Sequence, residues 1–134
     1  MIIMLIILFF LNTSPVHADM TTILGPVYIS KDHHSTYVKR SVLSFTAPVP
    51  GTGVIVVKNG GDSGKNHRVG SARIILNGEE VSGPEDFNKN VEELRYDITL
   101  KADNALGVEV RSCRDCEIAI SVLGPGTFPE RPAI

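Results

Sequence analysis

Hydrophobic and polar residues alternate along much of the chain with a period of two, which is the period of a β-strand. The clearest case is 94–101, where apolar residues hold the even positions and polar residues the odd ones. Other alternating or β-branched stretches lie at 27–29, 37–47, 54–57, 72–76, 79–81, 106–110 and 118–122. We therefore expect an all-β protein: an antiparallel β-sandwich, jelly-roll or Ig-like, with seven to eight strands and one short helical turn. A closed barrel is the alternative.

The stretch 67–88 carries the densest local signals. Residues 72–76 alternate, and the Asn77-Gly78 pair that follows adopts positive φ at low cost, which predicts a type I′ turn. Arg73 then lies diagonal to Glu80 as a favourable cross-strand pair. The predicted register sets Leu76 opposite Glu79, Ile75 opposite Glu80, and Ile74 opposite Val81.

A helical turn is expected directly after this hairpin. Ser82 and Glu85 have the spacing of a capping box, and Pro84 suits a first helical turn. We expect the helix to end near Asn90.

The remaining segments are expected to connect strands. Residues 19–26 are expected to form an unpaired lead-in, and 59–67 a flexible loop that contains three glycines. Asp103-Asn104 is expected to turn the chain, and 124–126 to end the ordered domain.

The first residues predict export. Residues 1–11 are almost wholly apolar, and Val16-His17-Ala18 places small residues at the spacing of a cleavage site. We therefore expect a signal peptide at 1–18, a β-sandwich domain at 19–124 and a flexible C-terminal tail at 125–134. The apolar run is shorter than the roughly 20 residues of a membrane-spanning helix, so a secreted or periplasmic protein is expected, with no membrane span after cleavage. An uncleaved signal anchor is the alternative.

The charge of the chain excludes one class of partner. The formal net charge is −2, with both signs interspersed. Nucleic acid is therefore not an expected partner, because phosphates favour clustered Lys and Arg.

Cys113 and Cys116 form a C-x-x-C motif. The apolar positions on both sides of it are even-numbered, so we expect a hairpin whose loop, Cys113-Arg114-Asp115, has three residues. The ends of a tight turn lie close enough for a disulfide, and an exported protein meets oxidising conditions. We predict a structural Cys113–Cys116 disulfide, with free thiols and a redox or metal role as alternatives.

No catalytic residue, metal site or cofactor is predicted. Residues 86–97 resemble part of a calcium loop, but Val91 stands where Gly is needed, so capping and turn roles are expected for Asp86 and Asn88. Residues 60–66 lack the spacing of a phosphate-binding loop. The histidines that follow the predicted signal peptide fall in predicted loops; they are His33, His34 and His67.

Four short motifs follow one another in the chain: R-V-x-S-A, L-N-G, P-x-D-F-N and N-x-L. They comprise Arg68, Val69, Ser71, Ala72, Leu76, Asn77, Gly78, Pro84, Asp86, Phe87, Asn88, Asn104 and Leu106. With them, the chain from about Phe45 to Leu123 resembles a β-sandwich module common in bacterial secreted and surface proteins. The resemblance implies an accessory or adhesive module without established catalytic residues.

We therefore expect an exported, non-enzymatic module that binds a glycan or a protein outside the cell. Loops on a rigid sandwich are the expected contact surface. The candidate binding residues are Asn59, Asp62, Lys65, Asn66, His67 and Arg68. A structural or assembly subunit that pairs strand edges is the alternative, and an unpaired strand at a terminus would be its sign. An enzyme ranks third.

The disulfide prediction is open to a direct test. Because both cysteines of the chain are expected to be oxidised, alkylation of the exported protein without reduction should add no mass. Alkylation after reduction should add two groups in the same mass measurement. Two alkylated thiols without reduction would contradict the disulfide.

Overall fold

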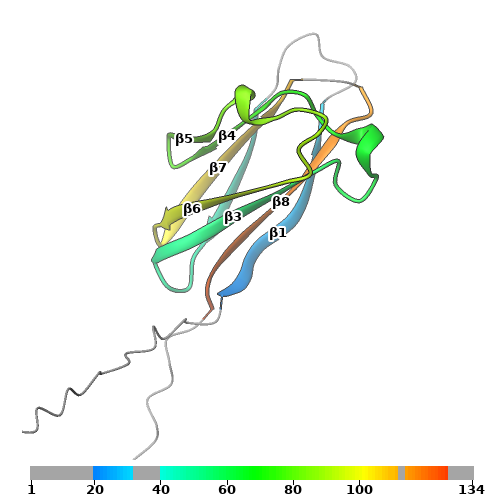
Figure 1. The fold of residues 1–134 in the computed structure, drawn as a ribbon. Helices are drawn as coiled ribbons and strands as arrows, with labels where there is room; N and C mark the ends of the chain where they lie inside the picture. Colours follow the sequence, from blue (N-terminus) through cyan, green and yellow to red (C-terminus); the bar gives the residue numbers. More distant parts are fainter. Residues whose placement is uncertain (1–19, 32–39, 112–113, 127–134) are drawn as a thin grey trace, which may run out of the picture.

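The computed structural model describes residues 20–31, 40–111 and 114–126. These form two four-stranded antiparallel sheets that face each other, so the predicted sandwich is confirmed and the barrel is not (Figure 1). Sheet A has the order β1-β8-β3-β6 and sheet B the order β2-β7-β4-β5. The strands are β1 Met20–Ser30, β2 Arg40–Thr46, β3 Gly51–Asn59, β4 Ala72–Leu76, β5 Glu79–Ser82, β6 Glu93–Leu100, β7 Asp103–Val110 and β8 Glu117–Pro125. Two 3₁₀ turns, η1 Lys65–His67 and η2 Pro84–Asp86, lie between strands.

The strands form four nested antiparallel pairs, of which only β4–β5 is a hairpin. β4 pairs with β5, β3 with β6, β2 with β7 and β1 with β8, all antiparallel. The β3–β8 and β4–β7 pairings then join these pairs into the two sheets. This order is that of a jelly roll, the first of the two predicted kinds of sandwich.

The innermost hairpin follows the sequence closely. Asn77 and Gly78 have φ of 51° and 86°, as the predicted turn requires. Of the predicted pairs, Leu76–Glu79 and Ile75–Glu80 are confirmed, and Arg73 Nε lies 2.9 Å from Glu80 Oε1. The third pair is wrong: Ile74 lies opposite Ser82, because a bulge places Val81 outside the regular pairing.

The expected helical turn is present but shorter than predicted. It is the single 3₁₀ turn η2 and does not continue to Asn90. The cap also differs by one residue, because the Asp86 carboxylate accepts the Gly83 backbone N–H at 3.1 Å. Ser82 Oγ donates to the same carboxylate oxygen at 3.0 Å, which holds the cap in place.

The two expected turns at 103–104 and 113–115 do not make hairpins. Both β6–β7 and β7–β8 join strands of different sheets, as do all consecutive strands except β4 and β5. Asp103 and Asn104 belong to β7 and pair with β2. Asn104 still closes the preceding turn through its side chain, whose Oδ1 accepts the Lys101 N–H at 2.9 Å.

The first and last strands are longer than predicted. The expected lead-in is wrong for residues 20–26, since Met20 pairs with Pro125 and Thr21 with Gly124. β1 tolerates Pro26 because it is an edge strand with an irregular register between Thr22 and Val27. β8 runs to Pro125, one residue past the predicted boundary at 124. The predicted signal peptide and residues 127–134 of the predicted tail lie outside the described residues.

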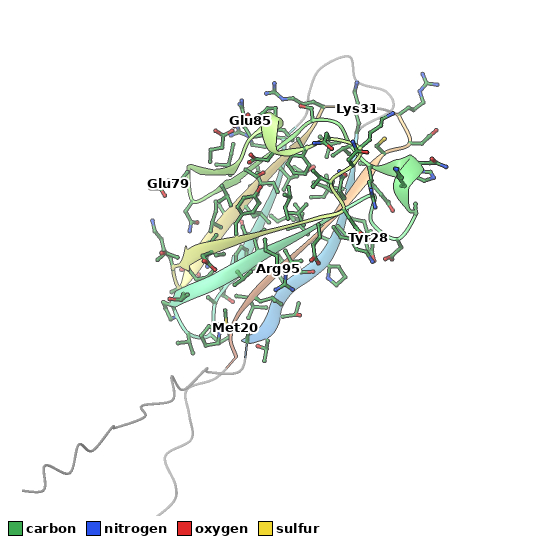
Figure 2. All side chains as sticks on the ribbon, viewed as in Figure 1. Met20, Tyr28, Lys31, Glu79, Glu85 and Arg95 are labelled. Carbon is green, nitrogen blue, oxygen red and sulfur yellow. The ribbon has the colours of Figure 1, made fainter. Side chains whose placement is uncertain are left out.

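The core lies between the sheets, where side chains fill the space (Figure 2). The alternating positions predicted to be apolar point into it. Ala72 and Ile74 of β4 are fully buried, and Leu76 is 6% exposed. The largest fully buried side chains are Ile55, Ile74, Leu106, Ile118 and Ile120. Among the described residues, no helix is long and apolar enough to cross a membrane.

A charged row crosses the outer side of sheet B. Glu109 of β7 lies between Arg40 of β2 and Arg73 of β4 in the strand register. Arg40 Nη2 donates to Glu109 Oε1 at 2.9 Å, and Arg111 Nη2 donates to Oε2 at 3.1 Å. Burial raises the pKa of Glu109, but hydrogen bonds from Arg111 and Arg40, together with their charges, outweigh it and lower the pKa below its usual range.

Replacing this carboxylate should weaken the fold mainly near neutral pH. Because the folded pKa of Glu109 is lowered, its contribution exists above the unfolded pKa and is lost as pH falls through the folded one. We expect Glu109→Gln to lower the free energy of unfolding at pH 7 by about 1–2 kcal/mol. Urea denaturation should show this difference shrinking toward pH 3.

The exposed Glu93→Gln is the matched control, because its partner Arg95 is a surface residue at 3.7 Å. It should change the free energy of unfolding by less than about 0.5 kcal/mol. A Glu109→Gln difference that stays constant from pH 7 to pH 3 would contradict the assigned role.

Candidate functional site

The structure removes Asn59 from the expected binding surface. Its side chain is buried, and Asn59 itself is only 3% exposed. The Asn59 amide donates to the backbone oxygens of Val69 and Asn88, each at 3.1 Å, and its Oδ1 accepts the Val69 N–H at 2.8 Å. Asn59 therefore joins three segments of the fold and offers no group to a partner.

Asp62 is exposed but engaged with neighbouring strands. Tyr28 on β1 donates its hydroxyl to Asp62 Oδ2 at 2.5 Å, and Lys58 Nζ lies 3.8 Å from Oδ1. The hydrogen bond to Asp62 raises the pKa of Tyr28, and burial and the nearby charges of Asp62 and Glu117 raise it further. The loop is also fastened to β8, because Ser63 Oγ donates to Glu117 Oε1 at 3.0 Å.

The end of the loop has similar contacts. His67 Nδ1 lies 2.7 Å from the Asp115 backbone oxygen. The Arg68 side chain is 15% exposed and donates from Nη1 to the Lys89 backbone oxygen at 3.3 Å. Lys65 and Asn66 are exposed. Much of the polar chemistry that the sequence assigned to binding thus holds the loop to the sandwich.

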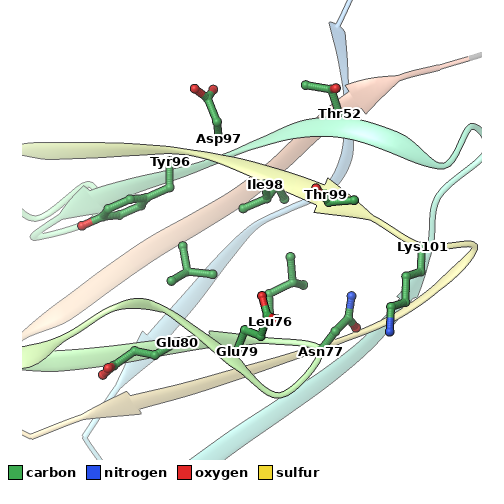
Figure 3. A pocket seen from close by; sticks show the side chains of 11 residues that line it. Thr52, Leu76, Asn77, Glu79, Glu80, Tyr96, Asp97, Ile98, Thr99 and Lys101 are labelled. Carbon is green, nitrogen blue, oxygen red and sulfur yellow. The ribbon is translucent and has the colours of Figure 1, made fainter.

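A cleft of about 790 Å³ lies elsewhere, between edge strands β5 and β6 (Figure 3). Buried Leu76 and Ile98, with half-buried Val81, give it apolar walls. Its other lining residues are Thr52, Asn77, Glu79, Glu80, Tyr96, Asp97, Thr99 and Lys101.

Tyr96 supplies an aromatic ring held in a fixed position. Figure 3 shows the ring between β6 and the β4–β5 hairpin. The Tyr96 hydroxyl lies 2.8 Å from Ser82 Oγ and 3.3 Å from Asp86 Oδ2. Burial raises the pKa of Tyr96; the Ser82 hydrogen bond opposes this, and Asp86 adds to the rise. The phenol therefore stays neutral and its ring is anchored at one end.

Polar groups at the cleft differ in availability. Glu80 is paired with Arg73, and the Asp97 side chain points away from the cleft (Figure 3). Glu79 and Lys101 are exposed, and neither side chain has a hydrogen bond or ion pair with another described residue. A ligand in the cleft would thus meet an acceptor and a cationic donor without first breaking internal contacts.

Sequence reasoning missed this cleft. The alternation of 94–100 places Tyr96 on the apolar face of its strand, and Glu79 and Glu80 follow the predicted turn, where solvated charge is the ordinary explanation for a pair of carboxylates. The cleft exists because β5 and β6 are edges of different sheets, which no local pattern encodes. The one available signal was a polar aromatic residue in an otherwise aliphatic face.

The other predicted sites stay structural or untested. Asp86 caps η2, and Asn88 Oδ1 accepts the Asn90 N–H at 2.8 Å, which confirms their capping and turn roles. Among the described residues, no three His, Cys, Asp or Glu side chains gather as metal ligands would. Cys116 is buried, whereas Cys113, His33 and His34 lie outside the described residues, so the disulfide stays a prediction.

The role of Asn59 leads to a stability prediction. Asn59→Ala removes three hydrogen bonds and leaves the buried Val69 N–H without its acceptor, so it should cost about 2–4 kcal/mol of unfolding free energy. Asn66→Ala in the same loop should cost less than about 0.5 kcal/mol, because Asn66 is exposed. Equal urea midpoints for the two variants would contradict the structural role of Asn59.

Comparison with known proteins adds no relative from which function could be transferred. No family model matches the chain, and neither the curated proteins nor the solved structures include a significant match.

Proposed function

We propose that the protein is an exported, non-enzymatic jelly-roll module that binds an extracellular glycan in the β5–β6 cleft. The observation that carries this proposal is the composition of the cleft. The cleft holds an anchored Tyr96 ring and apolar walls and, further along it, the exposed, unpaired side chains of Glu79 and Lys101 (Figure 3).

This combination suits a sugar because a sugar ring has two kinds of surface. Its C–H groups pack against an aromatic or aliphatic wall, and its hydroxyls both donate and accept hydrogen bonds. Glu79 can accept and Lys101 can donate, and charged partners make stronger hydrogen bonds than neutral ones. The cleft volume of about 790 Å³ also falls in the range of small-ligand sites, about 300–1,000 Å³.

The strand-pairing alternative has less support. Its expected sign is an unpaired strand at a terminus, but β1 pairs with β8 from Met20 to Ser30. β8 itself lies between β1 and β3, so both of its edges are occupied. A partner strand could still add to the outer edge of β6, which the experiment below distinguishes from a glycan.

A glycan array probed with the mature chain tests the proposal. We expect binding to a defined set of saccharides, with Glu79→Gln and Lys101→Met each weakening the best one about 10-fold or more in titration calorimetry. Tyr96→Phe should retain most of the affinity, because it keeps the ring. Lys65→Ala, in the exposed loop, is the matched control and should bind as the wild type does.

Three results would contradict the proposal or a part of it. Absence of binding to any saccharide, with a protein recovered by pull-down and lost on mutation of the β6 edge, would assign the site to a peptide strand. Saccharide binding that Lys65→Ala abolishes and Glu79→Gln leaves intact would return the site to the loop. Release of a cleaved sugar from the bound saccharide would contradict the non-enzymatic assignment.

A further inference from the structure

A second hollow of about 390 Å³ lies next to the cleft, on the other side of the Asn77-Gly78 turn. Asn77 lines both spaces. The chain at 101–103 also links them, since Lys101 lines the cleft and Asp103 lines the hollow. The hollow is lined by Ser44, Phe45, Thr46, Asn77, Asp103, Asn104 and Ala105.

The ridge between the two spaces is rigid. Asn77 donates its backbone N–H to the Ala105 oxygen at 2.9 Å, and Asn77 Oδ1 accepts the Ala105 N–H at 2.9 Å. Asn77 Nδ2 also donates to Asn104 Oδ1 at 3.0 Å. A ridge fixed in this way positions both spaces before a ligand arrives, which reduces the ordering cost of binding.

The hollow shares with the cleft exposed polar side chains, including a carboxylate, beside an apolar residue. Ser44, Thr46 and Asp103 are exposed and offer two hydroxyls and a carboxylate, while Phe45 is buried beneath them. Thr46 lies opposite Asp103 across the β2–β7 pair, so their side chains can contact one ligand group together. Among the described residues that line the hollow there is no cation, and its one aromatic residue, Phe45, is buried, so hydroxyl and carboxylate groups dominate its surface.

We propose that the cleft and the hollow are successive subsites for one linear oligosaccharide that crosses the Asn77-Gly78 ridge. The protein would then bind chains of several sugar units more tightly than single sugars. Thr46 and Asp103 would be the contact residues of the outer subsite. This inference rests on the proposed glycan function and adds the size class of the ligand.

Open space at the ridge is consistent with a ligand that passes over it. A Cβ built on Gly78 meets no atom within 4 Å, so the turn is not covered by another part of the described chain. Figure 3 places Asn77 and Lys101 together at one end of the cleft, where the proposed oligosaccharide would leave the cleft.

Affinity measured against chain length tests the inference. With oligomers of one to about six units of the sugar found on the array, the dissociation constant should fall about 10-fold or more between the shortest and the longest. Thr46→Trp fills the hollow and should remove this gain while leaving the shortest ligand unaffected. Asp103→Ala should reduce binding of the long oligomers about 5-fold, and it serves as the second variant if Thr46→Trp does not fold.

Val42→Trp is the matched control, because Val42 lies on the same strand, is 61% exposed and does not line the hollow. It should keep the full gain with length, and circular dichroism should show both Trp variants folded. An equal dissociation constant for all lengths, or an equal loss for short and long oligomers in Thr46→Trp, would overturn the inference. Failure of the glycan proposal differs from both, because no oligomer of any length would bind.

Discussion

Four antiparallel strand pairs are nested around the Asn77-Gly78 turn, and the register of this innermost hairpin constrains the β4–β7 pairing next to it in sheet B. β4 must present Ala72, Ile74 and Leu76 to the core, and a slip of one residue would turn them to the other face. The Asn77 side chain extends the constraint to the next strand, because it bonds the backbone of Ala105 on β7. Asn77 therefore both forms the turn of the hairpin and fixes the hairpin to β7.

Connections that cross between the sheets create a second requirement. Their backbone groups leave the strand ladders and need other partners where they are buried. Three polar side chains supply these partners. Asn59 bonds the backbone of Val69 and Asn88, Asp86 bonds that of Gly83, and Asn104 bonds that of Lys101. For this reason many polar residues of the chain stabilise the fold. The loop 59–68 consequently has fewer polar side chains available to a ligand than its composition suggests.

The cleft is a consequence of unequal edge strands. β5 has four residues and β6, the facing edge of the other sheet, has eight. The short strand leaves part of the space between the sheets uncovered, so Tyr96 from the core face of β6 becomes accessible at the edge. Of the polar groups at this edge, Glu80 and the Tyr96 hydroxyl are bonded within the fold, whereas the exposed Glu79 and Lys101 have no side-chain partner among the described residues.

The sequence by itself determined the local features: the strand faces, the Asn77-Gly78 turn, the Arg73–Glu80 pair and the place of the helical turn. Each depends on residues close together in the chain, whose spacing fixes which side chains share a face. Only the tertiary structure decided that β6–β7 and β7–β8 join different sheets, that residues 20–26 form a strand, and that Tyr96 lines a cleft. The physical reason is that alternation shows only that one face of a strand is buried. In a sandwich the strands of both sheets bury one face, so the pattern is the same in either sheet. The alternation within a strand therefore does not predict which strand it pairs with. A cleft between the edges of two sheets likewise has no pattern in any one stretch of the sequence.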